Sequence, residues 1–217
     1  DEYADFYSDD ANSSYLSDQL IAATNQEQGS YMVSSAAVPA KIFDGGASSQ
    51  ICNDCDFMTW GWWGRNSVGE VSYQVHLGNW IIGVRPENMD VPTTGTATYN
   101  GHAVGTVLND GAQYIATGTL RAEMDFGARN WDIIIENYDG KSFTTEVTFA
   151  TNAPTFSGNV TTGIASGSVS GAFAQGPGGA DMPPDPVKGI MGNFTANDNA
   201  GWSSTGIFAG STSGVTQ

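Results

Sequence analysis

The chain has 217 residues, a length that fits one domain of ordinary size or one domain with a trailing segment. It carries 23 acidic residues against 7 Lys and Arg, so its formal net charge is −16. A negative field of this size repels DNA, RNA and anionic lipid head groups, which argues against nucleic-acid binding. The sequence holds no run of 18 apolar residues, so we expect no membrane-spanning helix.

Residues 1–56 are predicted to form an acidic, mostly irregular N-terminal arm and linker. The first 40 positions hold seven acidic residues and no Lys or Arg, and a short helix is expected to start near Ser17. Acidic tails are usually solvated, although an acidic arm that binds a partner is the alternative. No signal-peptide pattern stands at residue 1, which fits a mature product or a piece of a longer chain.

The two cysteines, Cys52 and Cys55, form a C-x-x-C pair. A zinc site needs about four ligands, and a thioredoxin-like redox pair usually opens a helix in a βαβ setting that this sequence does not show. A small local disulfide in an oxidising compartment is the third interpretation, and we favour it. Such a short loop stabilises little by itself, but it would fix the entry to the next strand.

From about residue 57 the apolar residues alternate with a period of two, which indicates β-strands. The clearest example is residues 112–126, where the apolar positions include Leu120, Met124 and Phe126 and the opposite face is mostly polar. A strand of that length favours a barrel or a large twisted sheet. The predicted strands are residues 57–64, 73–84, 95–108, 112–126, 131–136, 143–149, 164–173, 189–196 and 202–210.

Short turns join these strands. Asp110-Gly111 and Asp139-Gly140 are strong hairpin signals, and consecutive hairpins build an up-and-down meander. The sequence therefore predicts an all-β fold, an antiparallel up-and-down β-barrel of eight or nine strands over residues 57–210, with residues 211–217 as a tail. An eight-stranded barrel is just wide enough to be filled by side chains or to hold one small ligand.

Catalytic and metal-binding patterns are weak. His76 and His102 are the only histidines, and no Ser-centred nucleophile motif accompanies them. Haem ligation by either histidine is conceivable, but a single His is a weak ligand signal without supporting groups. Carboxylates such as Glu123 and Glu146 are expected on the solvated outer wall, where they have no cleft to work in. We therefore expect no catalytic residues, no metal site and no resident cofactor.

Aromatic residues are the stronger candidates for binding. Six tryptophans cannot all fit inside a narrow barrel, so one surface should present aromatic rings to a loop, a partner or a ligand. The alternative is that residues 1–56 wrap over these rings and bury them. The candidate ligand-binding residues are Trp60, Trp62, Trp63, Tyr73 and Trp80.

Spaced glycines and aromatics resemble a known pattern. The matching segments are Gly95-Thr96-Ala97-Thr98-Tyr99, Met124-Asp125-Phe126-Gly127, Phe173-x-x-Gly176-Pro177, Gly192-x-Phe194, Gly206-x-Phe208-x-Gly210, Trp60-Gly61-x-Trp63 and Gly78-x-Trp80. They are similar to the C-terminal barrel of transferrin-binding-protein-B-like surface lipoproteins of Gram-negative bacteria, over residues 57–210. Two departures stand out, a Pro-rich segment at residues 182–186 in place of a charged short helix and the lack of a second, N-terminal handle domain.

The resemblance implies a secreted or cell-surface setting and a non-enzymatic binding role. The leading hypothesis is a module that captures a host or environmental protein or a small nutrient such as haem. The alternatives are a structural or adhesive unit that self-associates in a larger extracellular assembly, and a carbohydrate-binding module that uses exposed Trp.

Overall fold

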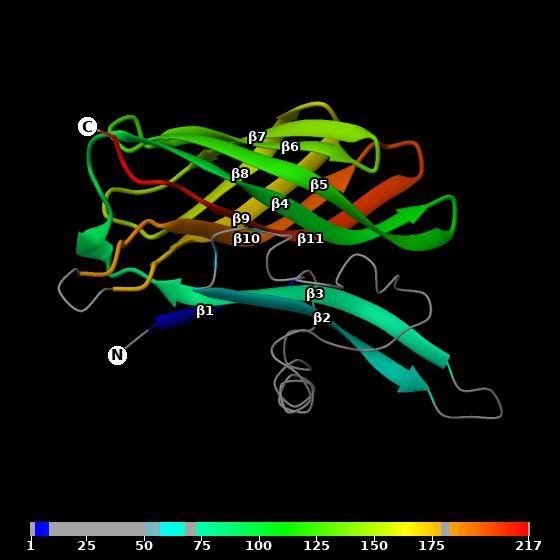
Figure 1. Ribbon diagram of the computed structural model, residues 1–217. Coiled ribbons are helices and arrows are strands. Elements are labelled where there is room, and N and C mark those ends of the chain that lie inside the picture. The colour runs from blue at the N-terminus through cyan, green and yellow to red at the C-terminus, as the bar shows by residue number, and fades with distance from the viewer. Residues whose placement is uncertain are drawn as a thin grey trace.

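The computed structural model describes residues 3–8, 52, 55, 57–67, 73–178 and 183–216, and for residues 3–8, 59, 61–67 and 73–78 it describes only the backbone. The described chain is all-β and consists of a closed barrel with a smaller sheet beside it (Figure 1). One 3-10 turn, η3 (Asn88–Asp90), lies between the two. No helix in the described part is both long enough and apolar enough to cross a membrane.

Eight antiparallel strands close the barrel. Each strand pairs with the next one along the chain, and the last strand pairs with the first. This arrangement confirms the predicted eight-stranded up-and-down barrel. The strands are β4 (Thr96–Asn109), β5 (Ala112–Asp125), β6 (Asn130–Tyr138), β7 (Lys141–Thr148), β8 (Thr155–Thr162), β9 (Ser166–Ala174), β10 (Gly189–Asn197) and β11 (Trp202–Ser211).

The two predicted hairpin turns are present. Asp110 and Gly111 join β4 to β5, and Asp139 and Gly140 join β6 to β7. All four residues have a positive φ, between 48° and 81°. Two consecutive residues with positive φ define a type I′ turn, whose twist matches that of the flanking strands.

Aromatic rings fill the barrel interior. Along β5 the burial alternates strictly from Ala116 onward, and the even-numbered residues that the sequence placed on one face point inward. The rings of Trp131 and Phe156 lie 4.8 Å apart between centroids, and those of Tyr138 and Phe194 lie 5.2 Å apart. Because the rings contact one another across the barrel, the interior is a packed core.

The barrel starts later than the sequence predicted. We placed its first strands at residues 57–64 and 73–84, but β2 (Met58–Ser67) and β3 (Tyr73–Arg85) lie outside it. They form a three-stranded sheet with β1 (Tyr3–Ser8), in the order β1-β3-β2. An N-terminal unit beside the barrel is therefore present, although none was expected. The short helix predicted near Ser17 lies outside the described residues.

The structure also contains a barrel strand that the sequence did not reveal. β8 replaces one of the two strands lost to the small sheet, which restores the count of eight. Its inward residues are Phe156, Gly158 and Val160, and its outward residues are Ser, Thr and Asn. A strand with only two large apolar residues gives a weak periodic signal.

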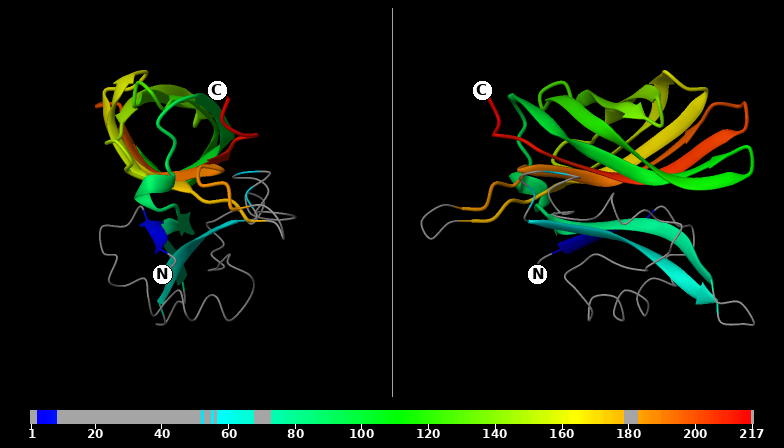
Figure 2. Two further views of the ribbon diagram at one scale, coloured as in Figure 1. Left: turned by 90° about the vertical axis from the view of Figure 1, so that its left-hand side faces the viewer. Right: turned by 45° about the vertical axis from the view of Figure 1, so that its right-hand side comes forward.

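The small sheet packs on the outside of the barrel, as both views in Figure 2 show. Its β3 contacts β4, β9, β10 and β11. The interface is an apolar cluster in which Met58, Trp60 and Ile81 of the sheet meet outward-facing barrel residues. These barrel residues are Val104, Ala174, Met191, Ile207 and Ala209.

Candidate functional site

The predicted aromatic binding residues fall into two groups. Trp60 and Trp80 are buried, with 6% and 3% of their surface exposed, and Trp60 belongs to the cluster between the sheet and the barrel. The side chains of Trp62, Trp63 and Tyr73 lie outside the described residues. The aromatic binding surface thus stays a prediction, and two of its five residues are covered in this structure.

Cys52 and Cys55 are joined by a disulfide, with their Cα atoms 5.4 Å apart. Both are buried in the same cluster as Trp60. The backbone N–H of Met58 donates a hydrogen bond to the carbonyl of Cys55 at 3.0 Å. The disulfide loop therefore leads directly into β2 and packs on the barrel wall.

Some polar groups inside the barrel form internal hydrogen bonds, whereas the indole N–H of Trp131 and the hydroxyl of Thr145 have no hydrogen-bond partner among the described residues. The buried hydroxyl of Tyr99 donates to the carbonyl of Val187 at 2.8 Å, and the hydroxyls of Tyr138 and Ser204 share a hydrogen bond of 2.7 Å. Burial, and secondarily the charge of Asp185, raises the pKa of Tyr99 well above its usual value. Because its rings are packed together and these hydroxyls are hydrogen-bonded, the interior is a core, and the candidate binding features lie on the outer surface.

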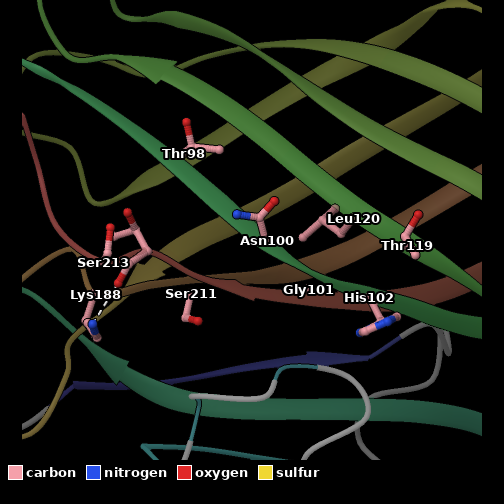
Figure 3. A pocket seen from close by; sticks show the side chains of 10 residues that line it. Thr98, Asn100, Gly101, His102, Thr119, Leu120, Lys188, Ser211 and Ser213 are labelled. Carbon is pink, nitrogen blue, oxygen red and sulfur yellow. Dashed lines mark hydrogen bonds between the residues drawn. The ribbon is translucent and has the colours of Figure 1, made fainter.

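A concave feature lies on the outer wall, where β4, β5 and β11 meet the C-terminal segment (Figure 3). It has a volume of about 790 Å³. We call it the β4–β11 pocket. Its lining residues are Thr98, Asn100, Gly101, His102, Thr119, Leu120, Lys188, Ser211, Thr212 and Ser213.

Strand register explains how these residues meet. Thr98, Asn100 and His102 are alternate residues of β4, so their side chains share its outer face. Asn100 lies opposite Ser211 of β11, and His102 lies opposite Thr119 of β5. The pocket exists only because β11 closes the barrel against β4, so no local sequence signal could have identified it.

Two side chains of the β4–β11 pocket, Lys188 and His102, contain nitrogen atoms that can form polar contacts. The Lys188 ammonium donates to the carbonyl of Thr212 at 2.7 Å and forms no ion pair with any carboxylate of the described chain. The Nδ1 atom of His102 is buried and has no hydrogen-bond partner among the described residues. The side chain of His76, the other histidine, lies outside the described part.

At the end of the barrel that carries the two type I′ turns, polar side chains link three hairpins. One carboxylate oxygen of Asp139 accepts hydrogen bonds from the hydroxyl of Tyr114 and the indole N–H of Trp202, both at 2.7 Å. Lys141 pairs with Asp198 at 2.9 Å and lies over the Trp202 ring. The hydrogen bond to Asp139 raises the pKa of Tyr114, and the hydrogen bond from Lys141 lowers the pKa of Asp198.

The strands β5, β6 and β7, which lie on the side of the barrel away from the small sheet (Figure 1), carry an acidic row. Glu123, Asp132 and Glu146 lie directly opposite one another on β5, β6 and β7, and all three are exposed. Like charges in such positions repel and destabilise a sheet. Within the described residues, no group of three or more His, Cys, Asp or Glu side chains is arranged to hold a metal ion.

Solved structures of transferrin binding protein B are similar to this chain. A double mutant from Haemophilus parasuis matches with a TM-score of 0.55 at 16% identity, covering 74% of this chain and 33% of that one. The protein from serogroup B Neisseria meningitidis matches with a TM-score of 0.53 at 19% identity, covering 73% and 32%. The chain thus spans about a third of the length of these structures.

The apo structure of the haemoglobin receptor HpuA from Kingella denitrificans is also similar, with a TM-score of 0.51 at 15% identity over 80% of this chain and 60% of that one. No protein-family model and no curated protein sequence matches the chain. The likeness concerns the fold: the barrel is a transferrin-binding-protein-B-like barrel. It confirms the resemblance that the spaced glycines and aromatics of the sequence predicted.

Proposed function

We propose that this chain is a non-enzymatic binding module on the outer surface of a Gram-negative bacterium, where it captures an extracellular protein. The observation that carries the proposal is the packed barrel interior, in which Tyr99, Phe173, Phe194 and Phe208 are fully or almost fully buried. A barrel filled by its own side chains offers ligands its outside. A protein partner uses such a surface, whereas haem, a large and mostly apolar ligand, needs a deep pocket lined by apolar side chains.

The similar structures support a protein as the partner. Their names describe one group as transferrin binding proteins and another as a haemoglobin receptor. Since the present chain shares their barrel fold at 15–19% identity, we extend the general role, capture of a protein at the cell surface, to it. Transferrin and haemoglobin are the probes that these names suggest.

Charge indicates which side of the barrel meets the partner. The net charge is −16, and the row of Glu123, Asp132 and Glu146 concentrates negative charge on one exposed face. Such a face attracts a partner with a basic surface and accelerates its association. Of the three, only Glu123 forms an ion pair among the described residues, and its partner is Arg121.

The proposal is tested by immobilising the chain and measuring the binding of transferrin and of haemoglobin in solution by interferometry. We expect saturable binding of at least one of them, with an association rate that falls as salt is added. Binding of neither protein, at low and at physiological salt, would contradict capture of a protein of this kind.

Neutralising the acidic row tests the charged face. The triple variant Glu123→Gln, Asp132→Asn, Glu146→Gln should lower the association rate about tenfold, since electrostatic steering contributes factors of roughly 10–10³. Its free energy of unfolding should not fall, because the substitutions remove like-charge repulsion. The matched control is the double variant Ser157→Ala, Ser168→Ala on the exposed wall of β8 and β9, which should associate like the wild type. An unchanged rate in the triple variant would place the partner elsewhere.

A further inference from the structure

We propose that the β4–β11 pocket binds an acidic sugar, a saccharide that carries a carboxylate beside its hydroxyl groups. This inference goes beyond the proposed function and does not rest on it. It stands on two features of the pocket: its hydroxyl-rich lining, and a fixed ammonium group that has no carboxylate partner among the described residues.

The lining suits a polyhydroxylated ligand. Most of its side chains end in a hydroxyl or an amide, and each of these groups can donate and accept hydrogen bonds. They come from three adjacent strands and the C-terminal segment, so they approach a ligand from several directions (Figure 3). The volume of about 790 Å³ lies within the usual range for small-molecule pockets. The hydroxyl- and amide-bearing residues are Thr98, Asn100, Thr119, Ser211, Thr212 and Ser213.

Lys188 supplies the positive charge for the carboxylate. One of the three N–H groups of its ammonium is held by the carbonyl of Thr212, which fixes the head group and leaves two donors. Two other cations of the described chain are paired with carboxylates, Arg121 with Glu123 and Lys141 with Asp198. An ammonium held in place without a carboxylate neighbour is a suitable partner for an anionic ligand.

His102 adds a second polar group at the β5 side of the pocket. Its ring lines the pocket, and an imidazole nitrogen can donate or accept a hydrogen bond, although the Nδ1 atom itself is buried and does not open into the pocket. Figure 3 shows the His102 ring at one end of the pocket and Lys188 at the other. The two groups thus bracket the hydroxyl-lined surface between them.

The overall negative charge of the protein does not forbid an anionic ligand. At physiological salt, charges farther away than about 8 Å are largely screened, so local groups decide. On the strand beside the pocket, Glu123 lies opposite Thr98, but it is paired with Arg121. The carboxylate of Asp185, three residues before Lys188, accepts the backbone N–H of Val187 at 3.1 Å.

The test is an NMR titration of the ¹⁵N-labelled chain with sodium glucuronate, with glucose as the neutral analogue and acetate as an anion without hydroxyls. We expect saturable shifts of the amides of Asn100, His102 and Ser211 with glucuronate. Glucose and acetate should each bind at least about tenfold more weakly, since each lacks one of the two kinds of contact. Equal binding of glucose, or glucuronate shifts that map outside the pocket, would overturn the proposal.

Two variants examine the charge separately. Lys188→Gln should weaken glucuronate binding about tenfold or more and leave glucose binding nearly unchanged. Thr98→Glu places a negative charge at an exposed position of the lining and should abolish glucuronate binding without disturbing the core. Thr155→Glu, an exposed position on β8 away from the pocket, is the matched control and should bind like the wild type. Wild-type affinity in the folded Thr98→Glu variant would also overturn the proposal.

Discussion

Glycines on neighbouring strands make room for the aromatic rings of the barrel. A Cβ atom added at Gly192 would lie 2.3 Å from the carbonyl oxygen of Ser170 and 2.6 Å from the Phe208 ring. A Cβ at Gly206 would lie 2.5 Å from the Phe194 ring. The glycines that suggested a family pattern in the sequence therefore have a packing role, because each allows a ring from an adjacent strand to lie against its backbone.

The substitution Gly192→Ala should destabilise the barrel by about 1–3 kcal/mol, since an inserted methyl group overpacks a dense core. The comparison is Gly127→Ala in an exposed turn, where the added Cβ meets one carboxylate oxygen of Asp125 at 3.2 Å and the effect should be small. The free energy of unfolding of both variants is measured by urea unfolding monitored through tryptophan fluorescence. Equal stability of the two variants would contradict the packing role.

At the scale of elements, the polar network at the turn end ties the hairpins β4–β5, β6–β7 and β10–β11 together. Its Lys141–Asp198 pair makes stability depend on pH. The pKa of Asp198 is lowered in the folded state, chiefly by the hydrogen bond from Lys141. The Asp198 carboxyl therefore binds a proton more readily in the unfolded chain than in the folded chain. The stabilisation by the ion pair is complete above the unfolded pKa, about 3.9, and is lost as the pH falls through the lower folded pKa.

The variant Lys141→Met should therefore lower the free energy of unfolding relative to the wild type at pH 6, and the difference should shrink at pH 3. Removing Lys141 takes away the largest cause of the lowered Asp198 pKa. Urea unfolding at the two pH values provides the comparison, and Lys188→Met serves as a control lysine without an ion pair in the described chain. A difference that grows at pH 3 would contradict a lowered pKa of Asp198 in the folded protein.

The sequence predicted the positions of the strands better than it predicted which strands pair with one another. The strand at residues 112–126 and the two Asp-Gly hairpins depend on local signals, alternation and turn chemistry, and the structure confirms them. β2 and β3 show the same alternation as barrel strands, so local pattern could not reveal that they belong to another sheet. The sheet that each strand joins is decided by long-range pairings, such as those of β1 with β3 and of β11 with β4. The β4–β11 pocket depends on the second of these pairings and could not be predicted either.

At the scale of the whole molecule, the two sheets form one apolar interface. Trp60 and Ile81 of the sheet and Met191 and Ile207 of the barrel wall are all buried there. The outer wall of a solvated barrel would normally be polar, so the sheet converts part of this wall into a second core.

The disulfide should help to hold this interface. In the double variant Cys52→Ala, Cys55→Ala, amides of β3 should exchange with solvent faster, whereas amides of β5 and β6 should keep wild-type rates, since local openings have their own free energies. A disulfide that closes so short a loop adds little to the free energy of unfolding, so the barrel of the variant should unfold at nearly the same urea concentration as that of the wild type. Hydrogen exchange by mass spectrometry measures these rates, and equally faster exchange in β5 would contradict a local role.

The central claim is that the barrel interior is a packed core and that recognition takes place outside it. The most direct measurement is a haemin titration that follows the Soret absorbance together with the methyl NMR signals of the inward residues Ile133, Val169 and Ile190. We predict no saturable one-to-one Soret change and no shift of these methyl signals. A saturable change accompanied by methyl shifts would show a ligand site inside the barrel and would contradict the claim.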